Sequence, residues 1–148
     1  MKKKRVILSW ALLIIWMLII FLMSHQSGEI SSNQSDLVLK LFNFIGIELN
    51  EYFGEVATIL IRKTAHFSEY MILYFLAYNL IRNYNRDNKM KILLIGFIFL
   101  YACSDEFHQY FIPGRVMAFK DVLIDTIGGI TGYLIINSIQ RYKIKKVK

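Results

Sequence analysis

The sequence predicts an all-α, polytopic membrane protein, in which a bundle of four transmembrane helices is joined by one short interfacial or re-entrant helix. The 148 residues are 55% hydrophobic and 15% aromatic, whereas a soluble domain is about 45–50% apolar. Hydrophobic segments of about 20 residues, long enough to cross a bilayer, alternate with clusters of basic residues. Because four such spans use roughly 80 residues, we expect residues 1–148 to form a single domain.

The net charge of +7 lies at the ends of the hydrophobic segments. Basic residues gather in residues 2–5, 82–91 and 141–148, which is typical of the cytoplasmic ends of spans under the positive-inside rule. No nucleic-acid-binding motif accompanies them, so we exclude that class of protein. The lone Cys103 excludes an internal disulfide bond and any zinc-type cysteine spacing.

The first predicted span is residues 6–23, which follow the basic cluster KKKR. The segment is longer than the signal-peptide core of about 7–15 residues, and no small-residue cleavage site follows it. We therefore expect an uncleaved signal-anchor helix.

The next helix is predicted at residues 35–47 (SDLVLKLFNFIGI), with Ser35 as its N-cap. Leu37, Leu41, Phe44 and Ile45 would share one face of this helix. The segment is too short to cross a bilayer, so we expect an interfacial or re-entrant helix at the outer leaflet. A helix packed on the spans is the alternative that the sequence leaves open.

The remaining predicted spans are residues 59–81, 92–111 and 120–139. The loop RNYNRDNKMK at residues 82–91 and the tail RYKIKKVK are basic, whereas residues 24–56 hold five acidic residues against one lysine. These alternating ends indicate a multi-pass protein of the cell membrane with both termini cytoplasmic.

Ionisable side chains interrupt these spans. An ion in lipid costs at least about a few kcal/mol, so such residues are candidates for a functional site. The second span carries a polar face at helical spacing, made by Arg62, Lys63, His66, Glu69 and Tyr70. Arg62 and Lys63 alone could extend to the interface, but Glu69 lies two turns deeper.

The third span ends in acidic and amide residues and is followed by a turn, which together contribute Asp105, Glu106, Gln109, Pro113, Gly114 and Arg115. The fourth span begins with Asp121 and Asp125, one turn apart, and continues into Gly128 and Gly132, a small-x-x-x-small pattern for close helix packing. At 1.5 Å per residue, three carboxylates (Glu69, Asp105 and Asp125) fall about 10 Å below the outer surface. We therefore expect one outward-facing charged cleft between the helices.

Carboxylates that lie close together in a low dielectric cannot all be ionised unless cations accompany them. We therefore predict two ion pairs in the cleft. One joins Arg62 or Lys63 to Asp105 or Asp125. The other joins Arg115 to Asp121 or Glu106.

The same residues resemble three ordered signatures of the VanZ-like family (teicoplanin resistance protein VanZ-like membrane proteins). The first signature contains Lys63, His66, Glu69 and Tyr70; the second contains Asp105, Glu106, Gln109, Pro113, Gly114 and Arg115; the third contains Asp121, Asp125, Gly128 and Gly132. A stretch with Ser24, Gln26, Ser27 and Ser31 also resembles the family. The likeness extends over residues 21–133, although Asp125 stands where many members have Asn.

The resemblance implies an integral membrane protein of the cell envelope, whose namesake is associated with resistance to the glycopeptide teicoplanin. Our first hypothesis is that the charged cleft engages an amphiphilic or lipid-linked head group. The expected partners are membrane lipids and a lipid-linked envelope precursor or lipoglycopeptide, with no nucleic acid and with oligomerisation left open. The candidate ligand-binding cluster is Arg62, Lys63, His66, Glu69, Tyr70, Asp105, Glu106, Gln109, Arg115, Asp121 and Asp125.

Three alternatives remain open at this stage. An intramembrane enzyme acting on a lipid-linked envelope substrate would draw catalytic groups from His66, Glu69, Asp105 and Glu106, although no known catalytic motif is matched. Such an enzyme could use the carboxylates with His66 and His108 to hold a divalent metal; we assign no cofactor and no metal from the sequence. A transporter would relay protons through the carboxylates, and a structural ion network would only specify helix packing.

Overall fold

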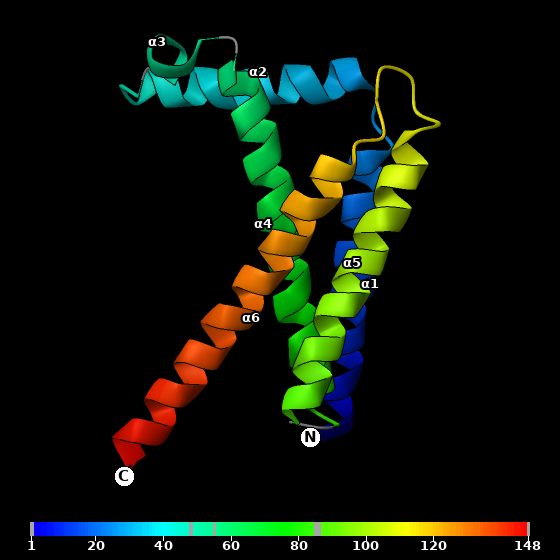
Figure 1. Ribbon diagram of the computed structural model, residues 1–148, viewed down its shortest axis with the longest axis vertical. Coiled ribbons are helices and arrows are strands. Elements are labelled where there is room, and N and C mark those ends of the chain that lie inside the picture. Colours follow the sequence, from blue (N-terminus) through cyan, green and yellow to red (C-terminus); the bar gives the residue numbers. More distant parts are fainter. Residues whose placement is uncertain (1, 48, 55, 85–86, 148) are drawn as a thin grey trace.

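The computed structural model describes residues 2–47, 49–54, 56–84 and 87–147, and these residues form helices and no strand. The bundle consists of four long helices: α1 (Lys2–Ser24), α4 (Val56–Ile81), α5 (Asn88–Gln109) and α6 (Phe119–Val147). Two shorter helices, α2 (Gly28–Phe44) and α3 (Leu49–Phe53), lie across one end of the bundle, and both termini lie toward the other end (Figure 1).

Each predicted span lies on one long helix, with differences at the ends. Helix α5 ends at Gln109, before the predicted boundary at residue 111, and Gly114 turns the chain toward α6 with a positive φ of 73°. Helix α6 continues beyond residue 139 through the basic tail, because Lys and Arg favour helix as well as aqueous surroundings. By length and composition, α1 and α6 are the two helices of the described chain that could each cross a membrane.

Helix α2 begins earlier than predicted, because its N-cap is Ser27, eight positions before the predicted Ser35. The Ser27 hydroxyl accepts a hydrogen bond from the Ile30 amide at 3.4 Å. Ser35 is buried mid-helix, where its hydroxyl donates to the carbonyl of Ser31 at 3.1 Å. The serines at 27, 31 and 35 are all chemically able to cap, so the choice depends on where the chain leaves α1.

The predicted apolar face of α2 is exposed, with 59% of the surface accessible at Leu37 and at Leu41 and 89% at Phe44. The opposite pattern would be expected of a helix on a water-soluble core. The buried face is instead formed by small or polar residues and one leucine: Gly28, Ser31, Ser35 and Leu39. Helix α2 therefore packs on α4 with one face and presents an apolar face outward. The packed alternative is present, and an interfacial position stays a prediction.

The acidic connection between α1 and α4 also contains α3, which the sequence did not predict. Two acidic residues of this connection, Glu48 and Glu55, lie outside the described residues. So do Asn85 and Arg86 of the basic loop between α4 and α5.

Helix α4 is the central element, because it packs against α1, α2, α5 and α6. Its buried residues Tyr70, Leu73, Tyr74 and Ala77 form the middle of the apolar core. Polar side chains complete the packing by bonding to backbone carbonyls on neighbouring helices. Trp16 of α1 donates to the carbonyl of Glu69 at 3.0 Å, which fixes α1 beside α4 at the level of the charged residues.

Outside this core, α1 exposes large apolar side chains around most of its circumference, among them Ile7, Leu8, Ile15, Leu18 and Leu22. Water would solvate such a surface poorly, whereas acyl chains would not. The exposed surface of the bundle therefore fits a lipid environment.

Helices α4 and α6 come into close contact at Gly128. A Cβ atom at Gly128 would lie 2.2 Å from the backbone oxygen of Phe67, so only glycine permits this approach. One turn further on, a Cβ atom at Gly132 would lie 3.1 Å from the Tyr74 ring. Small residues at this spacing allow two helix backbones to come close.

We predict that Gly128→Ala lowers the stability of the protein by about 1–3 kcal/mol, the usual cost of overpacking. The neighbouring backbone cannot move away as a flexible side chain could. The measurement is thermal unfolding of the purified protein in detergent micelles. Gly96→Ala is the matched control, since a Cβ atom there meets nothing within 4 Å; an equal loss in both variants would contradict the packing argument.

Candidate functional site

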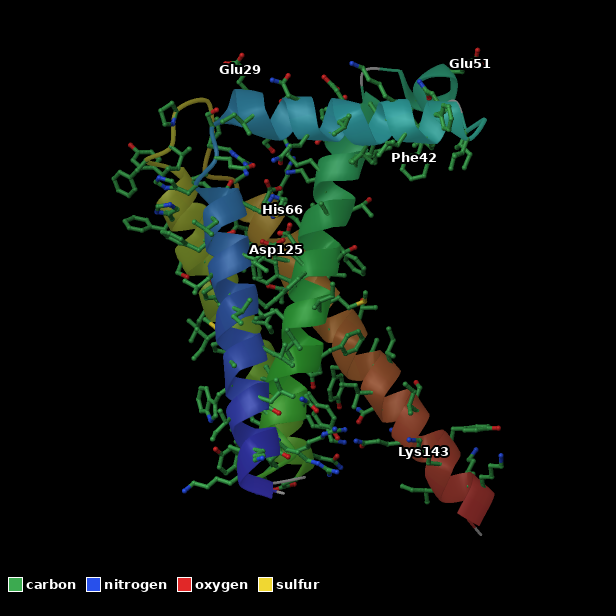
Figure 2. The ribbon with its side chains drawn as sticks, turned by 180° about the vertical axis from the view of Figure 1, so that it is seen from behind. Glu29, Phe42, Glu51, His66, Asp125 and Lys143 are labelled. Carbon is green, nitrogen blue, oxygen red and sulfur yellow. The ribbon has the colours of Figure 1, made fainter. Side chains whose placement is uncertain are left out.

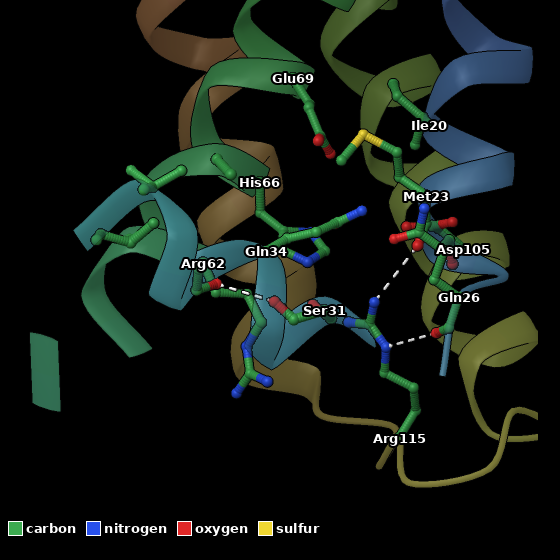
Figure 3. Close-up of a pocket in the computed structure, with 15 residues that line it drawn as sticks. Ile20, Met23, Gln26, Ser31, Gln34, Arg62, His66, Glu69, Asp105 and Arg115 are labelled. Carbon is green, nitrogen blue, oxygen red and sulfur yellow. Dashed lines mark hydrogen bonds between the residues drawn. The ribbon is translucent and has the colours of Figure 1, made fainter. Parts of the chain in front are cut away.

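The predicted charged cleft corresponds to a cavity of about 140 Å³ below α2. Its walls come from the end of α1, from α2, α4 and α5, and from the loop that precedes α6 (Figure 3). Charged groups on the wall are Arg62, His66, Glu69, Asp105 and Arg115. The structure thus brings together side chains from three predicted spans or their ends.

His66 and Asp125 form the deepest contact of the site (Figure 2). The His66 Nδ1 atom lies 3.5 Å from Asp125 Oδ1. Asp125 is 0% exposed and His66 is 9% exposed. The two residues face one another because α6 and α4 approach so closely at Gly128, one turn away from Asp125 along α6.

Asp105 approaches this pair from α5. Its carboxylate accepts a hydrogen bond from Gln109 Nε2 at 3.4 Å. Donor atoms of Asp105, Asp125 and His66 all lie within 4.8 Å of one another. Three helices therefore direct two carboxylates and one imidazole to a common point.

Two arginines lie on the cavity wall. Arg115 donates from Nε to the Gln26 carbonyl at 3.2 Å and from one terminal nitrogen to the Met23 carbonyl at 3.4 Å (Figure 3). Burial, followed by the like charge of Arg62, lowers the pKa of the Arg115 guanidinium. Two like charges held near one another favour an anion between them.

The two predicted ion pairs have other partners in the structure. Lys63 pairs with Asp121, one turn before the predicted Asp125, and this pair lies at the entry of α6. Arg115 bonds to backbone carbonyls, and Glu106 accepts a hydrogen bond from the Ala118 amide at 2.9 Å. The predictions were wrong because the loop before α6 determines the surroundings of Arg115 and Glu106, and the path of this loop could not be read from helical spacing.

The remaining candidates do not line the cavity: Lys63, Tyr70, Glu106, Gln109, Asp121 and Asp125. Tyr70 is fully buried, and its hydroxyl has no hydrogen-bond partner among the described residues. Glu106 is also fully buried and bonds to the loop. His108 lies elsewhere, at the surface, where its Nε2 atom is 3.1 Å from Nδ1 of His25.

The cavity also has polar wall residues that sequence reasoning did not assign to the site: Ser24, Gln26, Ser31, Gln34 and Ser35. Most of them come from α2, whose start was predicted too late. The spacing of Gly28, Ser31 and Ser35 is itself a helical stripe of small residues, and it was a usable signal for a helix face turned toward a polar cavity.

The profile of the VanZ/LLP1 family matches residues 9–140, which is most of the chain. The chain belongs to the VanZ-like family. Neither the curated proteins nor the solved structures contain a significant match. In this VanZ-like protein, the matched region contains every residue that lines the cavity.

We predict that the two charges of the Lys63–Asp121 pair in this VanZ-like protein can exchange positions without loss of the ion pair. The single variants Lys63→Asp and Asp121→Lys each place two like charges in contact, which should lower stability by about 1–3 kcal/mol, between the values for exposed and buried pairs. The double variant should regain most of the loss. Cell-membrane accumulation and thermal unfolding measure both effects.

The control is Lys120→Asp, at an exposed neighbouring lysine that forms no ion pair among the described residues. It should leave accumulation almost unchanged. Failure of the double variant to recover above either single variant would rule out a specific pairing.

Proposed function

We propose that the protein spans the cell membrane four times, with both termini in the cytoplasm and the cavity below the outer surface. Several features support this orientation. Both termini lie toward the same end of the bundle (Figure 1), and the carboxyl-terminal turn of α6 is basic. Basic ends remain on the cytoplasmic side. Helix α2 would then lie along the outer leaflet with its apolar face in lipid.

Single-cysteine labelling tests this topology. In a Cys103→Ser background, Glu29→Cys and Lys143→Cys place one thiol at each end of the bundle (Figure 2). A membrane-impermeant maleimide should label the cysteine at 29 in intact cells and the cysteine at 143 only after permeabilisation. The reverse pattern would overturn the orientation.

Within this topology, we infer that the protein binds an amphiphile whose compact anionic head group enters the cavity. The observation that carries this proposal is that the polar cavity adjoins an apolar groove of about 370 Å³ between α2, α3 and α4. Three residues, Val38, Ile61 and Ala65, belong to the walls of both. A polar space and an apolar groove that share a wall match the two parts of a lipid.

Size limits what the cavity can accept. Pockets for drug-sized ligands are about 300–1,000 Å³, whereas this cavity is about 140 Å³. It can accommodate a small head group such as a phosphate, but not the body of a glycopeptide. A lipoglycopeptide such as teicoplanin would engage the site through its lipid tail in the groove.

Two arginines on the wall, which also carries the carboxylates of Glu69 and Asp105, are the groups that would bind an anionic head group. Arg62 and Arg115 line the cavity from α4 and from the loop before α6. Guanidinium groups bind phosphate through two parallel hydrogen bonds. We therefore propose a lipid-linked envelope precursor carrying a phosphate as the ligand, and a contribution to teicoplanin resistance as a consequence of binding such molecules.

A binding assay with a fluorescent polyprenyl phosphate tests this function in detergent micelles. The corresponding uncharged polyprenol is the comparison, and wild-type protein should prefer the phosphate. Ala65→Phe places a large side chain where the cavity and the groove meet. It should weaken binding by roughly tenfold, equivalent to about 1.4 kcal/mol. Arg62→Gln should remove the preference for the phosphate.

Ala11→Phe is the matched control, because Ala11 is an exposed position on α1 and does not line the cavity or the groove. Equal affinities for phosphate and alcohol in the wild-type protein would contradict the head-group proposal. Equal losses of affinity in Ala65→Phe and Ala11→Phe would contradict the proposal that the ligand binds along the wall shared by the cavity and the groove.

A further inference from the structure

The deepest part of the site contains buried polar atoms that lack a hydrogen-bond partner. Both carboxylate oxygens of Asp125 and the Nδ1 atom of His66 have no partner of hydrogen-bond geometry among the described residues. Asp125 is 0% exposed, so water at the protein surface does not solvate it. A buried carboxylate without a partner is costly, and buried charges are normally paired or bound to a metal.

Two of the nearby cations, Lys63 and Arg115, are engaged elsewhere. Lys63 pairs with Asp121, and Arg115 donates to the carbonyls of Gln26 and Met23. A protonated His66 could balance one carboxylate. Asp105 and Glu69, which act electrostatically on His66, would still leave an excess of negative groups around a single imidazole.

We propose that His66, Asp105 and Asp125 form a binding site for one divalent ion of the Zn²⁺ or Mn²⁺ type. Each residue offers one ligand atom, and these atoms lie within 4.8 Å of one another. The recorded separation of 3.5 Å between His66 Nδ1 and Asp125 Oδ1 matches the spacing of ligands around Zn²⁺. Bond lengths of roughly 2.0–2.2 Å place tetrahedral ligands about 3.3–3.6 Å apart.

The donor set determines the class of ion. An imidazole nitrogen favours Zn²⁺ and other transition metals over Mg²⁺ and Ca²⁺, which prefer oxygen ligands. The two carboxylates would supply two negative charges against the two positive charges of the ion. Three protein ligands also leave a coordination position open.

That open position is accessible from the cavity, because His66 and Asp105 are wall residues while Asp125 lies behind them. An ion held there would face the same space as Arg62 and Arg115. A phosphate oxygen could then bind the ion while the guanidinium groups bind its other oxygens. Ion binding itself does not require an amphiphile; only this preference for phosphate rests on the proposed function.

Metal binding is tested on the full chain, purified in detergent, stripped of lipid and treated with EDTA before dialysis. Titration with ZnCl₂ and, separately, MnCl₂ should give about one ion per chain, as for a site with a complete ligand set. Asp125→Asn keeps the size of the side chain and removes a ligand charge. It should weaken binding at least roughly 100-fold, because loss of even an outer-shell partner costs about 10–100-fold.

His108→Gln is the matched control, since the His25–His108 pair at the surface is a second place where Zn²⁺ could attach. This variant should retain the ion. Loss of the ion in His108→Gln with retention in Asp125→Asn would overturn the proposal, as would absence of binding in the wild-type protein.

X-ray absorption at the zinc edge of the wild-type protein provides a measurement that needs no variant to fold. The expected shell contains one imidazole with oxygen ligands, whereas two imidazoles would place the ion at the histidine pair and refute the assignment. Because no lipid is present, ion binding can succeed when polyprenyl phosphate binding fails, and the two proposals are separable.

Discussion

The close contact of α6 with α4 at Gly128 is the constraint on which the rest of the structure depends. A Cβ atom there would lie 2.2 Å from the Phe67 carbonyl oxygen, so the two backbones touch beside His66. That contact directs Asp125 toward His66 and places both in the interior, where Asp125 is 0% exposed. The polar site therefore depends on the close helix packing that small residues allow. A larger side chain at Gly128 would separate the helices and the site together.

Buried polar groups require hydrogen-bond partners or opposite charges, and the two ends of the bundle differ in how fully they provide them. At the end near the basic tail, Lys91 is satisfied by the amide side chains of Asn137 and Gln140, at 3.0 and 2.6 Å. Near α2, Asp105 accepts a long hydrogen bond from Gln109, and Asp125 has no partner of hydrogen-bond geometry within the described residues. Complete satisfaction stabilises a helix contact, whereas incomplete satisfaction is typical of a site that receives a ligand. This contrast distinguishes the cavity from the other polar contacts of the bundle.

Helix α2 connects the polar cavity to the surroundings of the bundle. Its small polar face closes the cavity through Ser31 and Ser35, and its other face exposes Leu37, Leu41 and Phe44. A helix with this arrangement can lie in an interfacial plane while it covers a polar space. Val38 of α2 belongs to the walls of both the cavity and the apolar groove, so movement of this helix would change both at once.

The sequence by itself determined the helical class, the approximate position of each long helix and the polar residues that these helices carry, because periodicity and hydropathy are local properties. It also predicted that Glu69, Asp105 and Asp125 lie near one level, since helical rise is constant. It could not determine the partner of Lys63, the start of α2 or the bonds of Arg115. Those depend on the path of the loop before α6 and on which serine meets the end of α1, where several local choices are nearly equal in free energy. Tertiary packing decided among them: the loop holds Glu106 and Arg115, and α2 begins at Gly28, whose amide donates to the Pro113 carbonyl at 3.1 Å.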